Sequence, residues 1–291
     1  MQTAVNRAVD RGRLRWRNAL ERGLDHAVGF IRKDIVIAVS YRLQFLYQFS
    51  QVFFKVAVIY FIGQMVGSSG TPQTLRAYGS DYFVFALVGL AVNSYLSSAM
   101  VTITGTIRQM MDTGVLEVVC ATPIKSTWLL LYTALWPFLF ATIRVVMYFV
   151  LGVGLFGVHF DRANWLGAIL TMALAIPIFL LLAVTSSSIL IVVKKGDPAN
   201  WFFTSISGLL AGTMFPITVL PGWLYVLALC LPLTHVLEAL RQCLLVGAGL
   251  QDVARYLLTL ALFLIVLLPI TITVNRVCMV IAKRRGAFST Y

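Results

Sequence analysis

The side chains that most often perform chemistry are few and dispersed in this chain. There are eleven Asp and Glu residues, three His and four Cys among 291 residues. None of the acids forms a D-x-x-D or H-E-x-x-H arrangement, as an acid/base pair or a metal site would require. The cysteines form no C-x-x-C pair, so Cys230 and Cys243 are expected to be free thiols. The sequence therefore predicts no catalytic residue and no metal ligand.

Polar residues recur on one face of the first apolar segment. Gln44, Gln48, Gln51 and Lys55 stand at offsets 0, 4, 7 and 11, which places them together on a helix. A charge at bilayer depth costs about 2.5–3.5 kcal/mol and normally faces protein or water. The face could line a translocation route or a subunit interface. Alternatively, the helix begins in the cytosol, and Lys55 lies close enough to the cytoplasmic surface to extend its ammonium group into water. Arg144 poses the same question.

Two connectors carry the other conspicuous polar residues and helix breakers. Gly114–Trp128 holds Glu117, a Thr122-Pro123 step and Lys125, and Pro123 tends to end a helix before it. It is either a docking element or an ordinary polar connector. The segment 216–246 is mostly apolar but is broken by prolines and a glycine. The pieces after Pro221 are too short to span a membrane, which favours a re-entrant helical hairpin. Its marked residues are Pro216, Pro221, Gly222, Trp223, Pro232 and Arg241.

The composition is that of a membrane protein. Hydrophobic residues make up 59% and charged residues 12% of the chain, and the mean hydropathy is +0.88. A soluble domain has about 25% charged residues. We therefore predict an all-α polytopic membrane protein. Hydropathy predicts six spans, at residues 43–66, 82–105, 128–156, 165–193, 200–220 and 254–280.

The basic residues predict the orientation of these spans. Seventeen of the 23 Lys and Arg residues fall on the side of the termini and four on the other, with Lys55 and Arg144 inside spans. The positive-inside rule then places both termini in the cytoplasm of a plasma (inner) membrane. The net charge of +12 thus reflects contact with membrane lipids, and nucleic acid is not an expected partner. We expect a cytoplasmic tail at 1–42, a transmembrane domain at 43–280 and a second tail at 281–291.

The first tail contains apolar residues at helical spacing. Ile31, Ile35, Ala38 and Val39 share one face, which predicts an amphipathic helix in the cytoplasmic interface. The alternative is a cytosolic extension of the first span. No apolar region of a cleaved signal peptide precedes residue 29.

Some smaller features of the spans have a structural interpretation. The G-x-x-x-G pair of Gly208 and Gly212 allows close helix approach, within one chain or between two copies. We expect the hydroxyls of residues 185–188 to form interhelical hydrogen bonds, and we interpret His235 as structural.

The motifs quoted above also resemble a known family. "TGVLEVVCATPIKSTWLLL" and "FPITVLPGWLYVLALCLPLTHVLEALRQCLL" are similar to the corresponding segments of type-2 ABC exporter permeases. These include exporters of O-antigen, teichoic acid, nodulation factors and daunorubicin. The two segments occur in the order and at the separation that the family has. The resemblance covers nearly the whole chain.

The resemblance implies roles for several residues. Glu117, Thr122, Pro123 and Ile124 would form a coupling helix that docks on a separate ATPase subunit. The hairpin up to Arg241 would be the exit gate. Gly208 and Gly212 would lie at the contact with a second copy of the permease. Two ATPase subunits would hold ATP and Mg, because this chain has no G-x-x-x-x-G-K-[ST] phosphate loop and binds no cofactor of its own.

The expected function is that of a permease subunit of an ATP-driven exporter, without enzyme activity of its own. The substrate would be amphipathic or lipid-linked: a glycolipid, lipo-oligosaccharide, polysaccharide or drug. The alternatives are an ATPase-independent channel or scaffold and a lipid-modifying membrane enzyme. The sequence does not identify the substrate.

Overall fold

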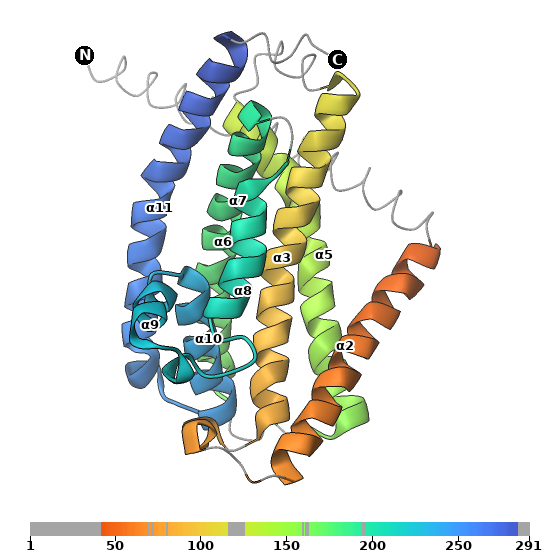
Figure 1. Cartoon of the computed structure of the whole chain (residues 1–291), viewed down its shortest axis with the longest axis vertical. Coiled ribbons are helices and arrows are strands. Elements are labelled where there is room, and N and C mark those ends of the chain that lie inside the picture. The colour runs from red at the N-terminus through yellow and green to blue at the C-terminus, as the bar shows by residue number, and fades with distance from the viewer. Residues whose placement is uncertain are drawn as a thin grey trace, which may run out of the picture. The chain divides into compact units, whose positions relative to one another are not determined.

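All elements in the described part of the chain are helical. The computed structural model describes residues 42–68, 70, 73–79, 81–115, 126–158, 160, 163–193 and 196–284. Five helices are long and apolar enough to cross a membrane (Figure 1). They are α2 (Arg42–Ser68), α3 (Tyr82–Asp112), α5 (Ser126–Phe156), α6 (Trp165–Val193) and α11 (Leu250–Arg284). The predicted spans one to four and six are each confirmed as a long apolar helix, and α3 continues seven residues beyond the predicted end at 105. The predicted interface helix at 31–39 lies outside the described residues.

The helix α3 is the centre of the bundle. Its most apolar window is 78% buried, whereas the corresponding windows of α2 and α11 are 17% and 11% buried. Residues of α3 pack against α5, α6 and α10 in the main apolar core. The helix begins where the Asp81 carboxylate accepts a hydrogen bond from the Phe83 amide, and it ends before Gly114, which has φ +70°. The helix is therefore well defined at both ends and covered along most of its length.

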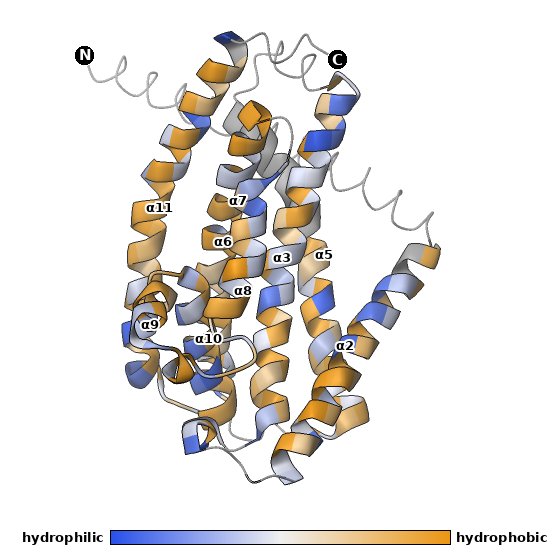
Figure 2. Cartoon of the chain, in the orientation of Figure 1, coloured by the Kyte–Doolittle hydropathy of each residue, from blue (hydrophilic) through white to orange (hydrophobic). Residues whose placement is uncertain are grey.

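The helix α2 packs along one narrow seam. Val52, Val56 and Ile59 are buried against α3 and α5, while most other apolar side chains of α2 are exposed. Figure 2 shows that polar residues are more frequent in its N-terminal half than in its mainly apolar C-terminal half. Figure 1 shows α2 diverging from α5 toward its N-terminal end.

The predicted fifth span at 200–220 is wrong in its extent. The chain forms α7 (Pro198–Trp201), one π turn η2 (Phe202–Ile206) and α8 (Ser207–Leu210), then leaves the helix. Gly212 has φ +78°, a left-handed conformation that ends helices, and Pro216 is extended. At 1.5 Å per residue the thirteen residues from Pro198 to Leu210 extend about 20 Å, less than the roughly 30 Å of a bilayer core.

A bent helix pair follows this short segment. The chain forms η3 (Ile217–Val219), α9 (Gly222–Leu229), α10 (Pro232–Arg241) and the π turn η4 (Gln242–Val246). The two arms meet at 87°. At the bend the Thr234 hydroxyl donates to the Ala228 carbonyl at 2.6 Å, and His235 Nε2 lies 2.9 Å from the Leu229 carbonyl. If the bent pair is counted as one span, the described residues contain six.

Hydroxyl groups join α6 to α11. Thr185 Oγ1 lies 3.0 Å from Thr271 Oγ1, and Asn275 Nδ2 donates to Ser188 Oγ at 2.9 Å. Ser186 donates instead to Asp197, the residue that caps α7. The predicted interhelical hydrogen bonds of residues 185–188 are thus confirmed for Thr185 and Ser188.

Candidate functional site

A buried arginine lies at the C-terminal end of α10. Arg241 is 0% exposed, and its guanidinium carbon lies 3.5 Å from the centre of the Phe85 ring on α3. Nη2 donates to the Thr213 carbonyl at 3.0 Å and to the Phe85 carbonyl at 3.3 Å. One cation therefore joins α10, the N-terminal part of α3 and the turn that follows α8.

Glu238 and Tyr78 complete this cluster. Glu238 Oε1 lies 4.0 Å from Arg241 Nη1, one helical turn before it, and the Tyr78 hydroxyl donates to Glu238 Oε2 at 2.8 Å. Burial and the neighbouring Glu238 carboxylate raise the pKa of Tyr78 well above its usual range. Among the described residues, Arg241 Nε and Nη1 and Glu238 Oε1 have no hydrogen-bond partner. We call Tyr78, Phe85, Thr213, Glu238 and Arg241 the arginine network.

The turn after α8 depends on a glycine of α3. A Cβ atom added to Gly89 would lie 1.9 Å from the Thr213 carbonyl oxygen and 2.8 Å from Arg241 Nη2. Only a residue without a side chain lets this carbonyl approach α3. The carbonyl follows the C-terminal end of a helix, where the backbone dipole is negative, so the guanidinium is electrostatically favoured there. The Thr213 hydroxyl also donates to the Gly208 carbonyl at 2.6 Å.

The other end of α3 also contacts the α6–α7 region. Arg108 donates to the Gly196 carbonyl at 3.1 Å. The Asn200 side-chain amide lies 3.5 Å from Thr104 Oγ1. The helix α3 therefore contacts the α7–α8 segment at two places. One is Asn200, near the beginning of that segment, and the other is Thr213, just after the end of that segment.

The predicted hairpin residues divide into buried and exposed groups. Pro216 and Pro232 are buried, and Pro232 occupies the first turn of α10. Pro221, Gly222 and Trp223 are exposed at the start of α9. The structure brings neither group into the arginine network, so only Arg241 of the predicted gate residues belongs to it.

The other predicted site residues have different surroundings. Glu117, Thr122, Pro123 and Ile124 lie outside the described residues, as does the side chain of Gln44. A Cβ on Gly208 would approach the Asn93 side chain of α3 to 3.0 Å, and Gly212 is buried within the turn after α8. Both glycines are thus in the intrachain packing that the sequence left open.

The helices α2 and α5 carry polar and basic residues in their middle parts. Gln48 is half-buried, and Gln51 and Lys55 are exposed. Arg144 of α5 is half-buried, donates through Nη1 to Ser98 Oγ of α3, and interacts electrostatically with Lys55. Among the described residues no acidic side chain pairs with either cation.

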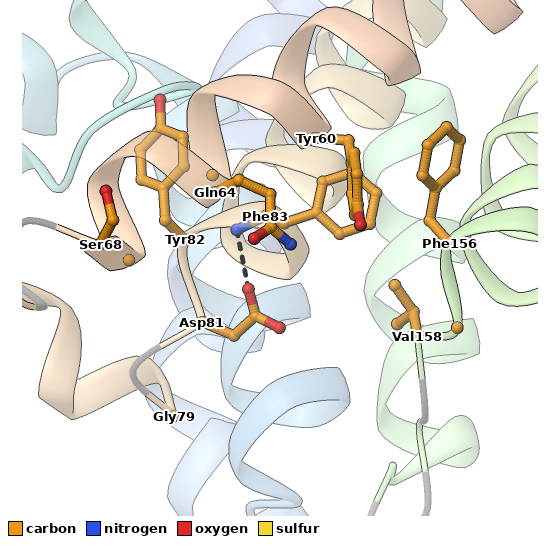
Figure 3. Close-up of a pocket in the computed structure, with 12 residues that line it drawn as sticks. Tyr60, Gln64, Ser68, Gly79, Asp81, Tyr82, Phe83, Phe156 and Val158 are labelled. Atoms are coloured by element: carbon orange, nitrogen blue, oxygen red, sulfur yellow. Dashed lines mark hydrogen bonds between the residues drawn. The ribbon is translucent and has the colours of Figure 1, made fainter.

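An aromatic pocket of about 550 Å³ lies where α2 ends and α3 begins (Figure 3). The rings of Tyr60, Phe83 and Phe156 contact one another with centroids 4.7–5.6 Å apart. Gln64 and Asp81 add polar groups to the lining. The segment from η1 (Gln73–Tyr78) to the start of α3 contributes residues both to the lining of the pocket and to the arginine network.

Sequence reasoning missed most of the arginine network. The spacing of Glu238 and Arg241, three residues apart on one helix, was the available signal for an ion pair. Tyr78, Phe85, Gly89 and Thr213 carry no local signal, because their partners lie 28 to 160 residues away.

The comparison with known families identifies the chain. A family model described as ABC-2 type transporter matches residues 35–245, more than half of the 291 residues. The chain belongs to the ABC-2 type transporter family. A comparison with curated proteins gives no match. The matched range contains the arginine network and the cations of α2 and α5. An ABC-2 membrane domain is a permease component that normally works with an ABC ATPase, and this chain is a multi-pass membrane protein.

Proposed function

We propose that this ABC-2 permease is the membrane subunit of an ATP-driven exporter in the plasma (inner) membrane. Two copies form the path, and two ATPase subunits holding ATP and Mg drive it. The distribution of basic residues supports cytoplasmic termini. The substrate is an amphipathic or lipid-linked molecule that enters from the cytoplasm or the inner leaflet.

One observation carries this proposal: the unbroken helix α3 connects the two regions that an exporter must couple. Its C-terminal end precedes the connector Gly114–Trp128, and its N-terminal part holds Arg241. Thirty-one residues at 1.5 Å each extend about 46 Å, enough to cross the bilayer. Because α3 is buried and capped, force applied at the connector reaches the arginine network as a displacement of the whole helix.

The arginine network then acts as the latch of an outer gate. Re-entrant α9 and α10 close the outer half of the path where α7–α8 stops short. Arg241 holds α10 to α3 and to the Thr213 carbonyl through hydrogen bonds that a small helix displacement lengthens together. A shift of about 1–2 Å between packed helices, typical of such transitions, is sufficient to break a hydrogen bond of 3.0 Å.

The first test is site-specific photo-crosslinking in native membranes. We place a photo-reactive residue at Glu117 or Ile124 and identify the captured protein by mass spectrometry. Capture of a soluble subunit that carries a phosphate loop is expected. Gln73, exposed in η1, is the matched control and should capture no such subunit. Capture of only lipid or of the chain itself from Glu117 and Ile124 would contradict the coupling role.

A second test separates coupling from folding. The substitution Glu117→Lys reverses the charge of the connector, so ATP hydrolysis by the reconstituted complex should no longer drive transport. Thermal unfolding of the permease should stay unchanged. Transport at the wild-type rate in this variant would remove Glu117 from the coupling mechanism.

A further inference from the structure

The cations Lys55 and Arg144 lie deep in the membrane region. Lys55 is thirteen residues before the end of α2 at Ser68, and Arg144 is twelve before the end of α5 at Phe156. At 1.5 Å per residue these separations are about 20 and 18 Å, well over half of a 30 Å bilayer core. Neither side chain can extend its charge to the outer surface.

The two cations interact electrostatically with each other, and neither pairs with an acidic side chain among the described residues. Ser98 accepts a hydrogen bond from Arg144 and so orients its guanidinium, while Lys55 is exposed and adds a second positive charge. The ion pair found among the described residues belongs to Arg241 and Glu238 instead. The Thr142 hydroxyl of α5 donates a hydrogen bond to the Tyr95 hydroxyl of α3. The Tyr148 hydroxyl of α5 donates a hydrogen bond to the Ser94 hydroxyl of α3. Two positive charges held together at this depth attract an anion with a double negative charge.

Polar residues lead from this pair toward the connector side. On α2, Gln51 and Gln48 continue the face of Lys55 toward the N-terminal end. On α3, a second row begins at Ser98 itself and recurs at helical spacing toward the C-terminal end: Thr102, Thr106 and Gln109, of which Thr102 and Gln109 are exposed. Both rows run toward the same membrane side, because α2 and α3 are antiparallel in Figure 1. A polar headgroup thus has hydrogen-bonding groups along its way to the cations.

We propose that Lys55 and Arg144 form a subsite for the phosphate or pyrophosphate headgroup of an exported amphiphile. The inference rests on the proposed function and names its substrate class. A phosphate monoester carries −1.5 to −2 charges near pH 7, which matches the two cations. The planar guanidinium of Arg144 binds two phosphate oxygens, and the compact ammonium of Lys55 neutralises the rest. The apolar tail remains against the exposed apolar face of α2.

Photo-labelling of the full chain in phosphatidylcholine nanodiscs tests the subsite. The probe is dodecyl phosphate with a photo-reactive alkyl chain, and dodecylphosphocholine with the same chain is the zwitterionic control. We expect dodecyl phosphate to label peptides of α2 or α5 at concentrations at least tenfold lower than the control. Lys55→Gln and Arg144→Gln should each raise the half-saturating concentration about tenfold. Lys55→Arg and Arg144→Lys should stay within about threefold of wild type.

The controls separate this subsite from a general charge effect. Arg276→Gln removes one exposed positive charge from α11 and should leave labelling unchanged. Equal labelling of the wild type and Lys55→Gln, or displacement of the probe by an equal concentration of inorganic phosphate, would overturn the proposal. The assay contains no ATPase. Failure to capture an ATPase therefore counts against the exporter, and loss of headgroup selectivity counts against the subsite alone.

Discussion

Two regions of this permease hold arginine within the apolar part of the chain, and they treat the charge in opposite ways. Arg241 is completely buried and is given an aromatic ring, two carbonyl oxygens and a carboxylate. Arg144 is half-buried, has the Ser98 hydroxyl, and lies beside the exposed Lys55. The described residues neutralise the charge of Arg241. They provide no negative group for Arg144 and Lys55.

The difference separates two uses of the same side chain. A buried charge without a partner is strongly unfavourable, so the groups around Arg241 must stay together in the folded chain. The exposed Lys55 and the half-buried Arg144 gain little from their own chain, so we expect their energetic effect to depend on a ligand. Substitutions in the arginine network should therefore change stability most, and substitutions at Lys55 and Arg144 should change ligand binding most.

The largest effect is expected from Arg241→Gln. The amide neither stacks on Phe85 as a cation nor neutralises Glu238, which remains buried with its charge. We expect a loss of about 3–5 kcal/mol in the free energy of unfolding, measured by thermal or denaturant unfolding in detergent. Adding Glu238→Gln should recover part of it. If the two residues act independently, the double variant will be less stable than Arg241→Gln by the full loss measured for Glu238→Gln alone. That result would contradict the coupling of the two side chains.

The next effect is expected from Gly89→Ala. The new Cβ would overlap the Thr213 carbonyl oxygen, so the turn after α8 must move away from α3. Overpacking of this kind costs about 1–3 kcal/mol. Gly105→Ala on the same helix is the matched control, since nothing lies within 4 Å of its added Cβ. We expect that variant to be at least as stable as wild type. Equal stability of the two variants would mean that the approach of Thr213 to Gly89 is unimportant.

A smaller effect is expected from Tyr78→Phe, which removes the hydrogen bond to Glu238. The loss should be about 1.5–3 kcal/mol at neutral pH, because the acceptor is charged. The raised pKa of Tyr78 also predicts a pH dependence. Its contribution is fully present below pH 10, the ordinary pKa of tyrosine, and is lost as the pH rises from there toward the folded-state pKa. Unfolding midpoints between pH 8 and 11 should fall less in Tyr78→Phe than in wild type. Parallel curves would assign the alkaline loss to other groups.

The smallest effect on stability is expected from Lys55→Gln. Because Lys55 has no acidic partner among the described residues, the free energy of unfolding should change by less than about 0.5 kcal/mol. The same variant should lose alkyl phosphate binding about tenfold. A loss of stability as large as that of Arg241→Gln would show that Lys55 is neutralised within the chain, and the contrast between the two regions would disappear.

Most of the long helices were predictable because they depend on local sequence. Five helices follow from apolar runs of at least 20 residues. The 200–220 segment failed because hydropathy registers only apolar content. That content continues past Leu210, while the backbone leaves the helix at Gly212, whose φ of +78° no hydropathy average contains.

The site was predictable only where its signal was periodic. Spacing alone placed Gln48, Gln51 and Lys55 on one face, and the helix breakers drew attention to the segment that contains Arg241. The partners of Arg241 come from α3 and from the turn after α8, brought together by packing of the whole bundle. No local rule specifies that a glycine at position 89 makes room for a carbonyl at position 213.

The arginine network also has a consequence for the order in which the protein is made. Phe85 is synthesised 156 residues before Arg241, which donates a hydrogen bond to the Phe85 carbonyl. At a synthesis rate of roughly 5–20 residues per second, about 8–30 s pass between the two. During that time the contacts of α3 with Arg241 cannot yet form. The last third of the nascent chain completes a site prepared by the first, so truncation before residue 241 should leave the early helices inserted but unlocked.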